Sequence, residues 1–212
     1  MFRRVEASSD NSRVSTLLSN LAQVYMQQGR LTESASLQER SLAMFRRIHG
    51  SNDHSDVVAA LRGLAEVYQA QGRLDEAVTL YDESLAMERR TLGGKDHKSV
   101  VASLFCLAKL YAAHGRLEKS TALYMEALAM LRRIHGHKDH SSVAVSLWSL
   151  AQVYRAQGRL DDSASLEEES LAMKRRFHGS KDHSDVAASL CGLARVYKPQ
   201  GRLHDSASLI AV

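Results

Sequence analysis

Proline, long apolar runs and any strong excess of one charge are missing from this chain of 212 residues. It has one proline and 44% hydrophobic residues, a composition that argues against long disordered linkers. The opening residues Met1–Arg4 begin no apolar run of the length of a signal peptide, and no stretch is long enough to span a bilayer. The net charge of +4 comes from interleaved acids and bases, which excludes a basic tail.

The chain instead repeats one motif every 43 residues. The string Leu21–Tyr25 returns from Leu64, Leu107, Leu150 and Leu193. A Gly-Arg-Leu tripeptide returns with the same period, at Gly29, Gly72, Gly115, Gly158 and Gly201. A period of 20–50 residues indicates stacked supersecondary units. Such arrays usually present binding surfaces rather than reaction centres.

Cys106 and Cys191 lie two repeats apart, and the chain has no other cysteine. Stacked units would hold their sulfur atoms too far apart for a disulfide bond. Free thiols fit a reducing compartment, so we expect a cytoplasmic protein.

Each repeat has the pattern of two helices. In residues 54–96, apolar residues follow helical spacing from Val57 until Gly72, a residue that tolerates the positive φ of a helix end. A second helical pattern begins at Leu74 and ends in basic residues before Gly93, where cations complement the helix dipole. The pattern predicts a helix A, a tight turn, a longer helix B and a polar loop. We expect an end of a preceding repeat at 1–12, repeats at 13–55, 56–98, 99–141 and 142–184, and a truncated repeat at 185–212.

Neither helix can bury its apolar stripe alone, so the repeats have to pack against one another. Ala65 and its equivalents are small where helix B has to approach, and Leu61 and its equivalents would fill the seams between units. Truncating one of these leucines to alanine should cost about 2–5 kcal/mol.

The run Leu-x-x-Leu-Ala-x-x-Tyr followed by glycine resembles the tetratricopeptide repeat. Its extension carries an Asp-His pair, as at Asp96-His97, and resembles the long units of kinesin light chains and nephrocystin. The resemblance implies an all-α, right-handed superhelical solenoid of antiparallel helix pairs, with about five units. It also implies a non-catalytic scaffold for protein partners. Where the family has proline after Asp-His, this chain has Ser55, Lys98, Ser141 and Ser184, and we expect serine to cap these helices.

By the same resemblance, helix A lines a concave face that binds peptides. The candidate peptide-binding residues on that face are Asn20, Gln23, Arg62, Glu66, Phe105, Lys109, Trp148, Gln152, Arg155, Arg195 and Lys198. Kinesin light chains have asparagine at the site of Asn20. The later repeats of this chain have other residues at that site, beginning with Gly63. The aromatic and basic residues of repeats three to five suit an acidic segment with an apolar anchor. Alternatively, Phe105 and Trp148 pack in the core and the bases are solvated.

Other functions have weaker signals. Arginine pairs such as Arg132-Arg133 recur in each unit, and their positive charge would suit phosphate groups. Nearby acids and the helix dipole favour a structural role for these arginines instead. Nucleic acid is therefore not the expected partner. His135, His137 and His140 are the densest histidine cluster, yet no cysteine or paired acid completes a known metal spacing. We therefore expect no metal and no cofactor. Each histidine or aspartate that could look catalytic recurs once per period, which indicates structure rather than an enzyme.

The phase of the repeat at the ends predicts a piece of a longer array. Met1–Val5 matches the end of a helix B one period earlier, and the last helix B is about half the length of its equivalents. Pro199 should fray the last helix A. The alternative is an array that associates end to end through uncapped repeats.

Overall fold

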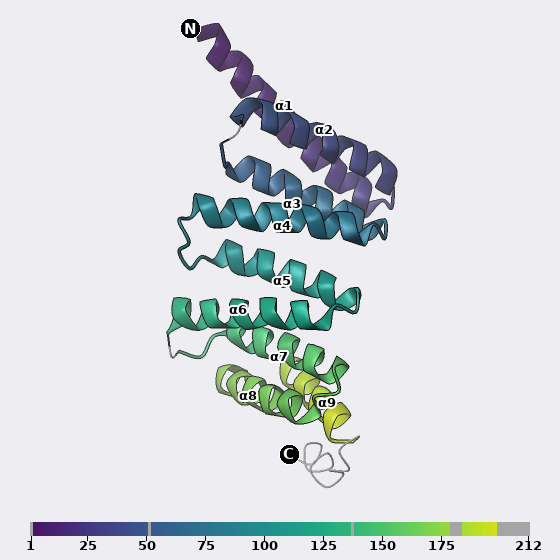
Figure 1. Ribbon diagram of the computed structural model, residues 1–212, viewed down its shortest axis with the longest axis vertical. Coiled ribbons are helices and arrows are strands. Elements are labelled where there is room, and N and C mark those ends of the chain that lie inside the picture. The colour runs from purple at the N-terminus through teal and green to yellow at the C-terminus, as the bar shows by residue number, and fades with distance from the viewer. Residues whose placement is uncertain (1, 51, 137, 179–183, 199–212) are drawn as a thin grey trace. The chain divides into compact units, whose positions relative to one another are not determined.

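The computed structural model describes residues 2–50, 52–136, 138–178 and 184–198 (Figure 1), and the side chains from residue 11 on, except that of His178. All the described elements are α-helices, and no strand occurs among the described residues. The chain divides into two compact units, Met1–Lys95 and Asp96–Val212. It is an all-α helical-repeat solenoid, as the 43-residue period predicts.

Within each unit, consecutive helices pack side by side and run in opposite directions (Figure 1). The first unit holds α1 (Phe2–Gln27), α2 (Leu31–His49), α3 (Ser55–Ala70) and α4 (Leu74–Thr91). The second holds α5 (Lys98–Ala113), α6 (Leu117–His135), α7 (Ser141–Ala156), α8 (Leu160–His178) and α9 (Ser184–Tyr197). Helices α3, α5, α7 and α9 are helices A of the repeat, and α2, α4, α6 and α8 are helices B.

Glycine ends helix A as the sequence predicts. Gly72 has φ +75°, a conformation that side chains with a Cβ rarely adopt. Its amide bonds the carbonyl of Gln69, and the amide of Arg73 reaches back to Tyr68 over 2.9 Å. These bonds satisfy carbonyls that the helix end leaves open, so the chain reverses within three residues.

Histidine, not serine, caps the start of helix A. Nδ1 of His54 accepts the amide N–H of Asp56 at 3.2 Å, and Nδ1 of His97 and His140 each accept the amide two residues on in the same way. The predicted caps, Ser55 and its equivalents, are the first helical residues instead. A residue in that position already has helical dihedrals, whereas the preceding histidine is extended and can fold its ring back over the amides.

Helix α1 differs from the expectation that residues 1–12 end a separate helix. It runs without a break over Phe2–Gln27. The later loops turn at a glycine with positive φ, as at Gly50 and Gly136, but the equivalent position holds Ala7. Without that glycine, no local signal interrupts the helix.

The packing predicted from the small and large apolar positions is confirmed. Leu61, Leu104 and Leu147 are fully buried, as are Ala65 and Ala108. One core cluster lies between α2 and α3, where Leu42 and Phe45 meet Leu61 and Leu64. The repeated leucines and alanines therefore form a regular packed frame that carries the loops and the surface residues.

Arginines at the ends of helices B pair with acids of the neighbouring repeat. Arg133 donates to both carboxylate oxygens of Asp96, over 2.6 and 2.8 Å, and Arg90 pairs with Asp53 in the same register. Arg132 bonds Glu169 at 2.9 Å. This is the arrangement expected of a structural role for the arginine pairs.

No disulfide bond joins Cys106 and Cys191, both of which lie in the described part of the chain. A helix that could cross a membrane, by length and apolar character, does not occur among the described residues.

Candidate functional site

A pocket of about 520 Å³ opens in the second unit between α5, α6 and α7. It brings together four of the predicted peptide-binding residues, which are Phe105, Lys109, Trp148 and Gln152. They come from successive turns of α5 and α7, so the 43-residue period sets them side by side. Tyr124 of α6 lies in the pocket wall, and burial raises its pKa to about 12, which keeps the hydroxyl protonated.

The structure separates Trp148 from the core. Trp148 is 38% exposed, while its neighbour Leu147 is fully buried. Phe105 is half-buried and packs edge-on against Tyr124, with ring centroids 5.3 Å apart. Phe105 therefore supports the pocket wall, and Trp148 presents a large apolar surface to solvent.

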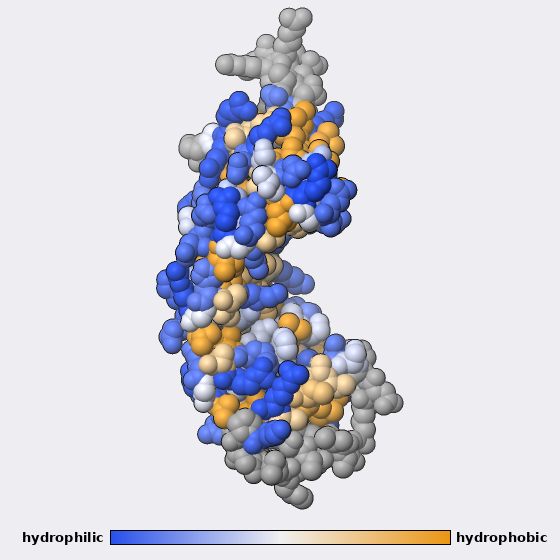
Figure 2. Space-filling view, turned by 90° about the vertical axis from the view of Figure 1, so that its right-hand side faces the viewer, coloured by the Kyte–Doolittle hydropathy of each residue, from blue (hydrophilic) through white to orange (hydrophobic). Residues whose placement is uncertain are grey.

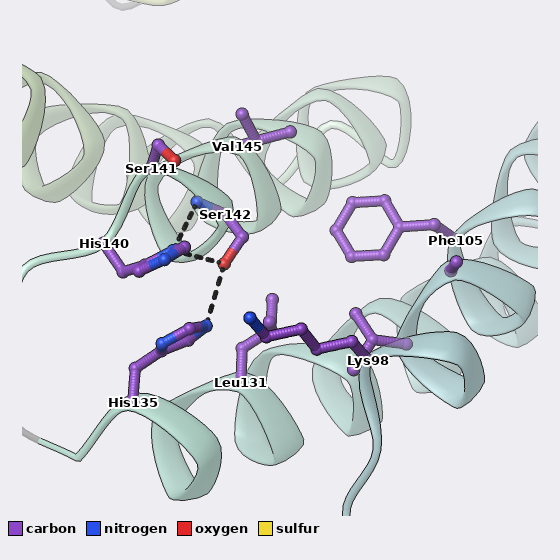
Figure 3. A pocket seen from close by; sticks show the side chains of 10 residues that line it. Lys98, Phe105, Leu131, His135, His140, Ser141, Ser142 and Val145 are labelled. Carbon is purple, nitrogen blue, oxygen red and sulfur yellow. Dashed lines mark hydrogen bonds between the residues drawn. The ribbon is translucent and has the colours of Figure 1, made fainter.

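A second pocket, of about 410 Å³, continues along the same two helices A (Figure 3). It shares Phe105 and Val145 with the first pocket. Val145 is 48% exposed. Figure 3 shows the Phe105 ring pointing into the opening, with Val145 above it and His135 and His140 at the far end. The two pockets form one apolar trough along α5 and α7.

Polar residues flank this trough at the C-terminal end of α7. Nε2 of Gln152 donates a 2.7 Å hydrogen bond to Oε1 of Glu167, and the Arg155 guanidinium donates to the side-chain oxygen of Gln152. Glu167 is fully buried, and its Oε2 accepts no hydrogen bond. Burial raises the pKa of Glu167, while the charges of Arg155, Lys174 and Arg195 act against that shift.

The other predicted site residues lie elsewhere. In the first unit, Asn20 and Gln23 are exposed on α1, and Arg62 and Glu66 are half-buried on α3. Burial raises the pKa of Glu66, and the charge of Arg62 opposes this. In the second unit, Arg195 is exposed on α9, and Lys198 is exposed just beyond its end. None of these residues lines the trough.

The sequence interpretation missed Val145 and Glu167. Glu167 occupies the helix-B position that Tyr81 and Tyr124 hold in other repeats, so its acidic character breaks the period. That break was a usable signal. Val145 gave no signal, because an apolar residue at helical spacing reads as core.

Exposed hydrophobic residues also gather on one face of α1, where Val14, Leu17, Leu21 and Val24 follow helical spacing. On the face drawn in Figure 2, orange areas of hydrophobic residues are separated by blue hydrophilic ones. The trough differs from the stripe on α1 because two pockets hollow it, and we take the trough as the main candidate for binding.

Three residues of the first unit could hold a metal ion. His49, His54 and Asp56 place one donor atom each within 4.8 Å of one another. These are not the residues of the densest histidine cluster in the sequence, His135, His137 and His140. His137 lies outside the described residues, and His135 and His140 contact the hydroxyl group of Ser142 instead of a carboxylate.

Comparisons with known proteins identify the family of the chain. The sequence profile of the Tetratricopeptide repeat family matches residues 13–87, 56–133, 100–176 and 142–209. The chain belongs to the tetratricopeptide repeat family. A comparison with curated proteins finds no match.

Solved structures place it among the kinesin light chain-like members. The kinesin light chain nearly identical TPR-like repeats of Podosopora anserina are 28% identical, with a TM-score of 0.80 over 95% of this chain and 93% of that chain. A single-residue variant of the same repeats gives the same identity and TM-score over 92% of its chain. BtubC (BKLC) from P. vanneervenii shares the fold, with 23% identity and a TM-score of 0.81 over 98% of this chain and 82% of that one.

Tetratricopeptide repeats of this type are scaffolds for protein–protein interaction, and the present chain is such a scaffold. Its partners are therefore proteins. Proteins with this repeat and fold are typically non-catalytic.

Proposed function

We propose that this scaffold binds a peptide segment of a partner protein along the trough between α5 and α7. The segment inserts an apolar side chain beside Trp148, and acidic residues near it meet the basic groups of the second unit. The chain performs no catalysis in this role, and it works without a cofactor.

The observation that carries the proposal is the exposure of Trp148 in a pocket. A scaffold gains nothing in stability from leaving 38% of an indole in solvent beside an open cavity. Tryptophan and arginine are the residue types most enriched among binding hot spots, because they supply a large contact area and several hydrogen bonds.

The charges around the pocket select the ligand. Lys109 is the only charged residue among the described residues that line the pocket with Trp148. Arg155 lies one turn beyond Gln152, and Arg195 is exposed on the next helix A. A peptide with acidic residues next to its anchor therefore gains favourable electrostatic interactions, while a basic peptide is repelled.

A peptide array tests this proposal. The probes are synthetic peptides with one tryptophan or leucine flanked by Asp and Glu, and matched peptides in which Lys replaces the acids. We expect wild-type protein to bind acidic peptides in preference, and Trp148→Ala and Arg195→Ala to weaken them. The control is Phe177→Ala, which removes an aromatic residue that is 41% exposed but lies outside the trough.

Two results would contradict the proposal. One is equal binding of acidic and basic peptides by the wild-type protein. The other is an unchanged set of captured partners when Trp148→Ala and Arg195→Ala are compared with the wild type in a pull-down.

End-to-end self-association remains the competing proposal. It concerns residues at the ends of the array, and residues 199–212 lie outside the described residues. Light scattering at increasing protein concentration separates the two, because growth in mass supports association and a constant monomer mass removes it.

A further inference from the structure

We propose that His49, His54 and Asp56 form a zinc site in the loop that joins α2 to α3. This site lies in the first unit, is independent of the peptide-binding proposal, and uses none of the residues of the trough.

The loop sets the three side chains close together. His49 is the last residue of α2, His54 precedes the first turn of α3, and Asp56 lies in that turn. Gly50, with φ +63°, reverses the chain between them. The chain therefore brings two imidazoles and one carboxylate together within eight residues.

Two of the three distances between donor atoms are close to those around a tetrahedral ion. Nε2 of His49 is 3.1 Å from Oδ2 of Asp56, and Nδ1 of His54 is 3.4 Å from the same oxygen. Bonds of about 2.0–2.2 Å to zinc place neighbouring ligand atoms roughly 3.3 Å apart in a tetrahedron. All three donor atoms lie within 4.8 Å of one another, so side-chain rotations without a change of the backbone path can direct them at one ion.

The ligand chemistry suits zinc. Two neutral imidazoles and one carboxylate are ligands that zinc accepts, and three protein ligands leave a fourth position for water or for a ligand from a partner. The His49 side chain is 17% exposed, while those of His54 and Asp56 are 41% and 38% exposed. One ligand is thus held by packing, and the other two give the ion a path from solvent.

Binding has to replace three existing contacts. Nε2 of His49 and Oδ2 of Asp56 share a 3.1 Å hydrogen bond, which the ion must break. Nδ1 of His54 accepts the Asp56 amide N–H at 3.2 Å, and the rings of His49 and His54 are stacked with centroids 3.5 Å apart. The ion takes the lone pair of Nδ1, so the helix cap is exchanged for a metal bond, and the rings turn out of their parallel stack.

The third repeat offers a natural comparison without the carboxylate. His135 and His140 are stacked at the same 3.5 Å, but Ser142 takes the place of Asp56 and its Oγ lies 2.8 Å from Nδ1 of His140 (Figure 3). A neutral hydroxyl is a weak ligand, and Lys98 lines the same pocket with a positive charge. The second repeat has Leu92 in place of the first histidine.

The fourth repeat has the same three residue types in its sequence, at His178, His183 and Asp185. His183 lies outside the described residues, so the experiment removes this second set with His183→Ala. The full chain with that change serves as the reference protein.

Zinc alone is the probe, titrated by calorimetry, and cobalt(II) replaces it for a visible spectrum that reports tetrahedral coordination. We expect the reference protein to bind one equivalent. His49→Leu and Asp56→Ser introduce the residues that other repeats have in these places, so both variants should fold, as circular dichroism can verify. Each should lower zinc affinity by more than about tenfold.

His135→Leu is the matched control, because it removes the equivalent histidine of the third repeat. It should leave zinc affinity unchanged. The proposal is overturned by a reference protein that binds neither ion, or by His49→Leu and Asp56→Ser proteins that bind zinc as the reference does. It is also overturned when His135→Leu lowers affinity as much as they do.

Discussion

Glu167 on α8 fills space that Gly192 leaves free on α9, since a methyl group on Gly192 would lie 2.7 Å from Oε2 of Glu167. The first repeat has the same relationship between Gln38 and Gly63, at 2.6 Å. A long polar side chain on helix B therefore faces a glycine on the next helix A. The buried group differs in charge, because the first repeat buries an amide and the fourth buries a carboxyl group.

This difference predicts that Glu167→Gln stabilises the protein at neutral pH. Burial raises the pKa of Glu167 above its ordinary value, so folding favours the protonated form. Below about pH 4, the group is protonated in both folded and unfolded chains and costs nothing. The cost grows as the pH rises from the unfolded-state pKa of about 4.3 to the folded-state pKa, and it stays constant above that, whereas glutamine has no such cost.

Thermal unfolding followed by circular dichroism at pH 4 and pH 7.5 measures this effect. We expect equal melting temperatures at pH 4 and a higher one for the variant at pH 7.5. A lower melting temperature at pH 7.5 would mean that the charges of Arg155, Lys174 and Arg195 outweigh the cost of burial.

The regular features of the fold were predictable because they repeat. Glycine turns and buried leucines such as Leu104 recur with the period, and each recurrence has the same physical cause. The repeat also identified Trp148 and Phe105, since these are positions where the period is broken by large side chains. The structure brings both to one pocket.

Single substitutions in the frame were harder to interpret. Ala7 replaces a loop glycine and lets α1 continue, but one alanine among several changes in that segment gives no clear sign of this. The histidine caps were missed because serine is the commoner cap. The approach of His49 to Asp56 depends on the path of the loop, which residue spacing along the chain does not define.

A serine on helix B ties it to helix A of the same repeat. Oγ of Ser120 donates a 2.8 Å hydrogen bond to the carbonyl oxygen of Ala108, and Ser163 bonds Ala151 in the same way. We expect Ser120→Ala to cost about 1 kcal/mol, the usual net contribution of a hydrogen bond. Urea unfolding measures it.

Ala77 occupies the equivalent position in the second repeat, so alanine fits the space. A matched control is Ser141→Ala, which changes an exposed serine at the start of α7. An equal loss of unfolding free energy in both variants would show that the hydrogen bond to Ala108 does not stabilise the protein.

The pair of Arg133 with Asp96 should stabilise the second unit only above acidic pH. The Arg133 guanidinium donates two hydrogen bonds to the carboxylate and lowers the pKa of Asp96. Since the folded-state pKa is depressed, the contribution is complete above the ordinary value of about 3.9 and is lost as the pH falls through the folded-state pKa.

Asp96→Asn tests this by thermal unfolding between pH 2.5 and pH 7. The variant should melt below the wild type at pH 7 and together with it at the acid end. The pair is largely exposed, so 1 M salt should reduce the difference at pH 7. A gap between the two proteins that persists at the lowest pH would rule out the ion pair as its cause.

Adjacent alanine substitutions at Leu147 and Trp148 separate the frame from the binding surface. Leu147 is fully buried, so Leu147→Ala should cost about 2–5 kcal/mol. Trp148 is 38% exposed, and other repeats place Ser19, Arg62 or Cys191 there, so the frame accommodates smaller or polar side chains. Trp148→Ala should therefore lower the melting temperature less than Leu147→Ala does, yet abolish capture of an acidic peptide with an apolar anchor. If Trp148→Ala unfolds the protein as readily as Leu147→Ala, the indole belongs to the core and the trough loses its anchor site.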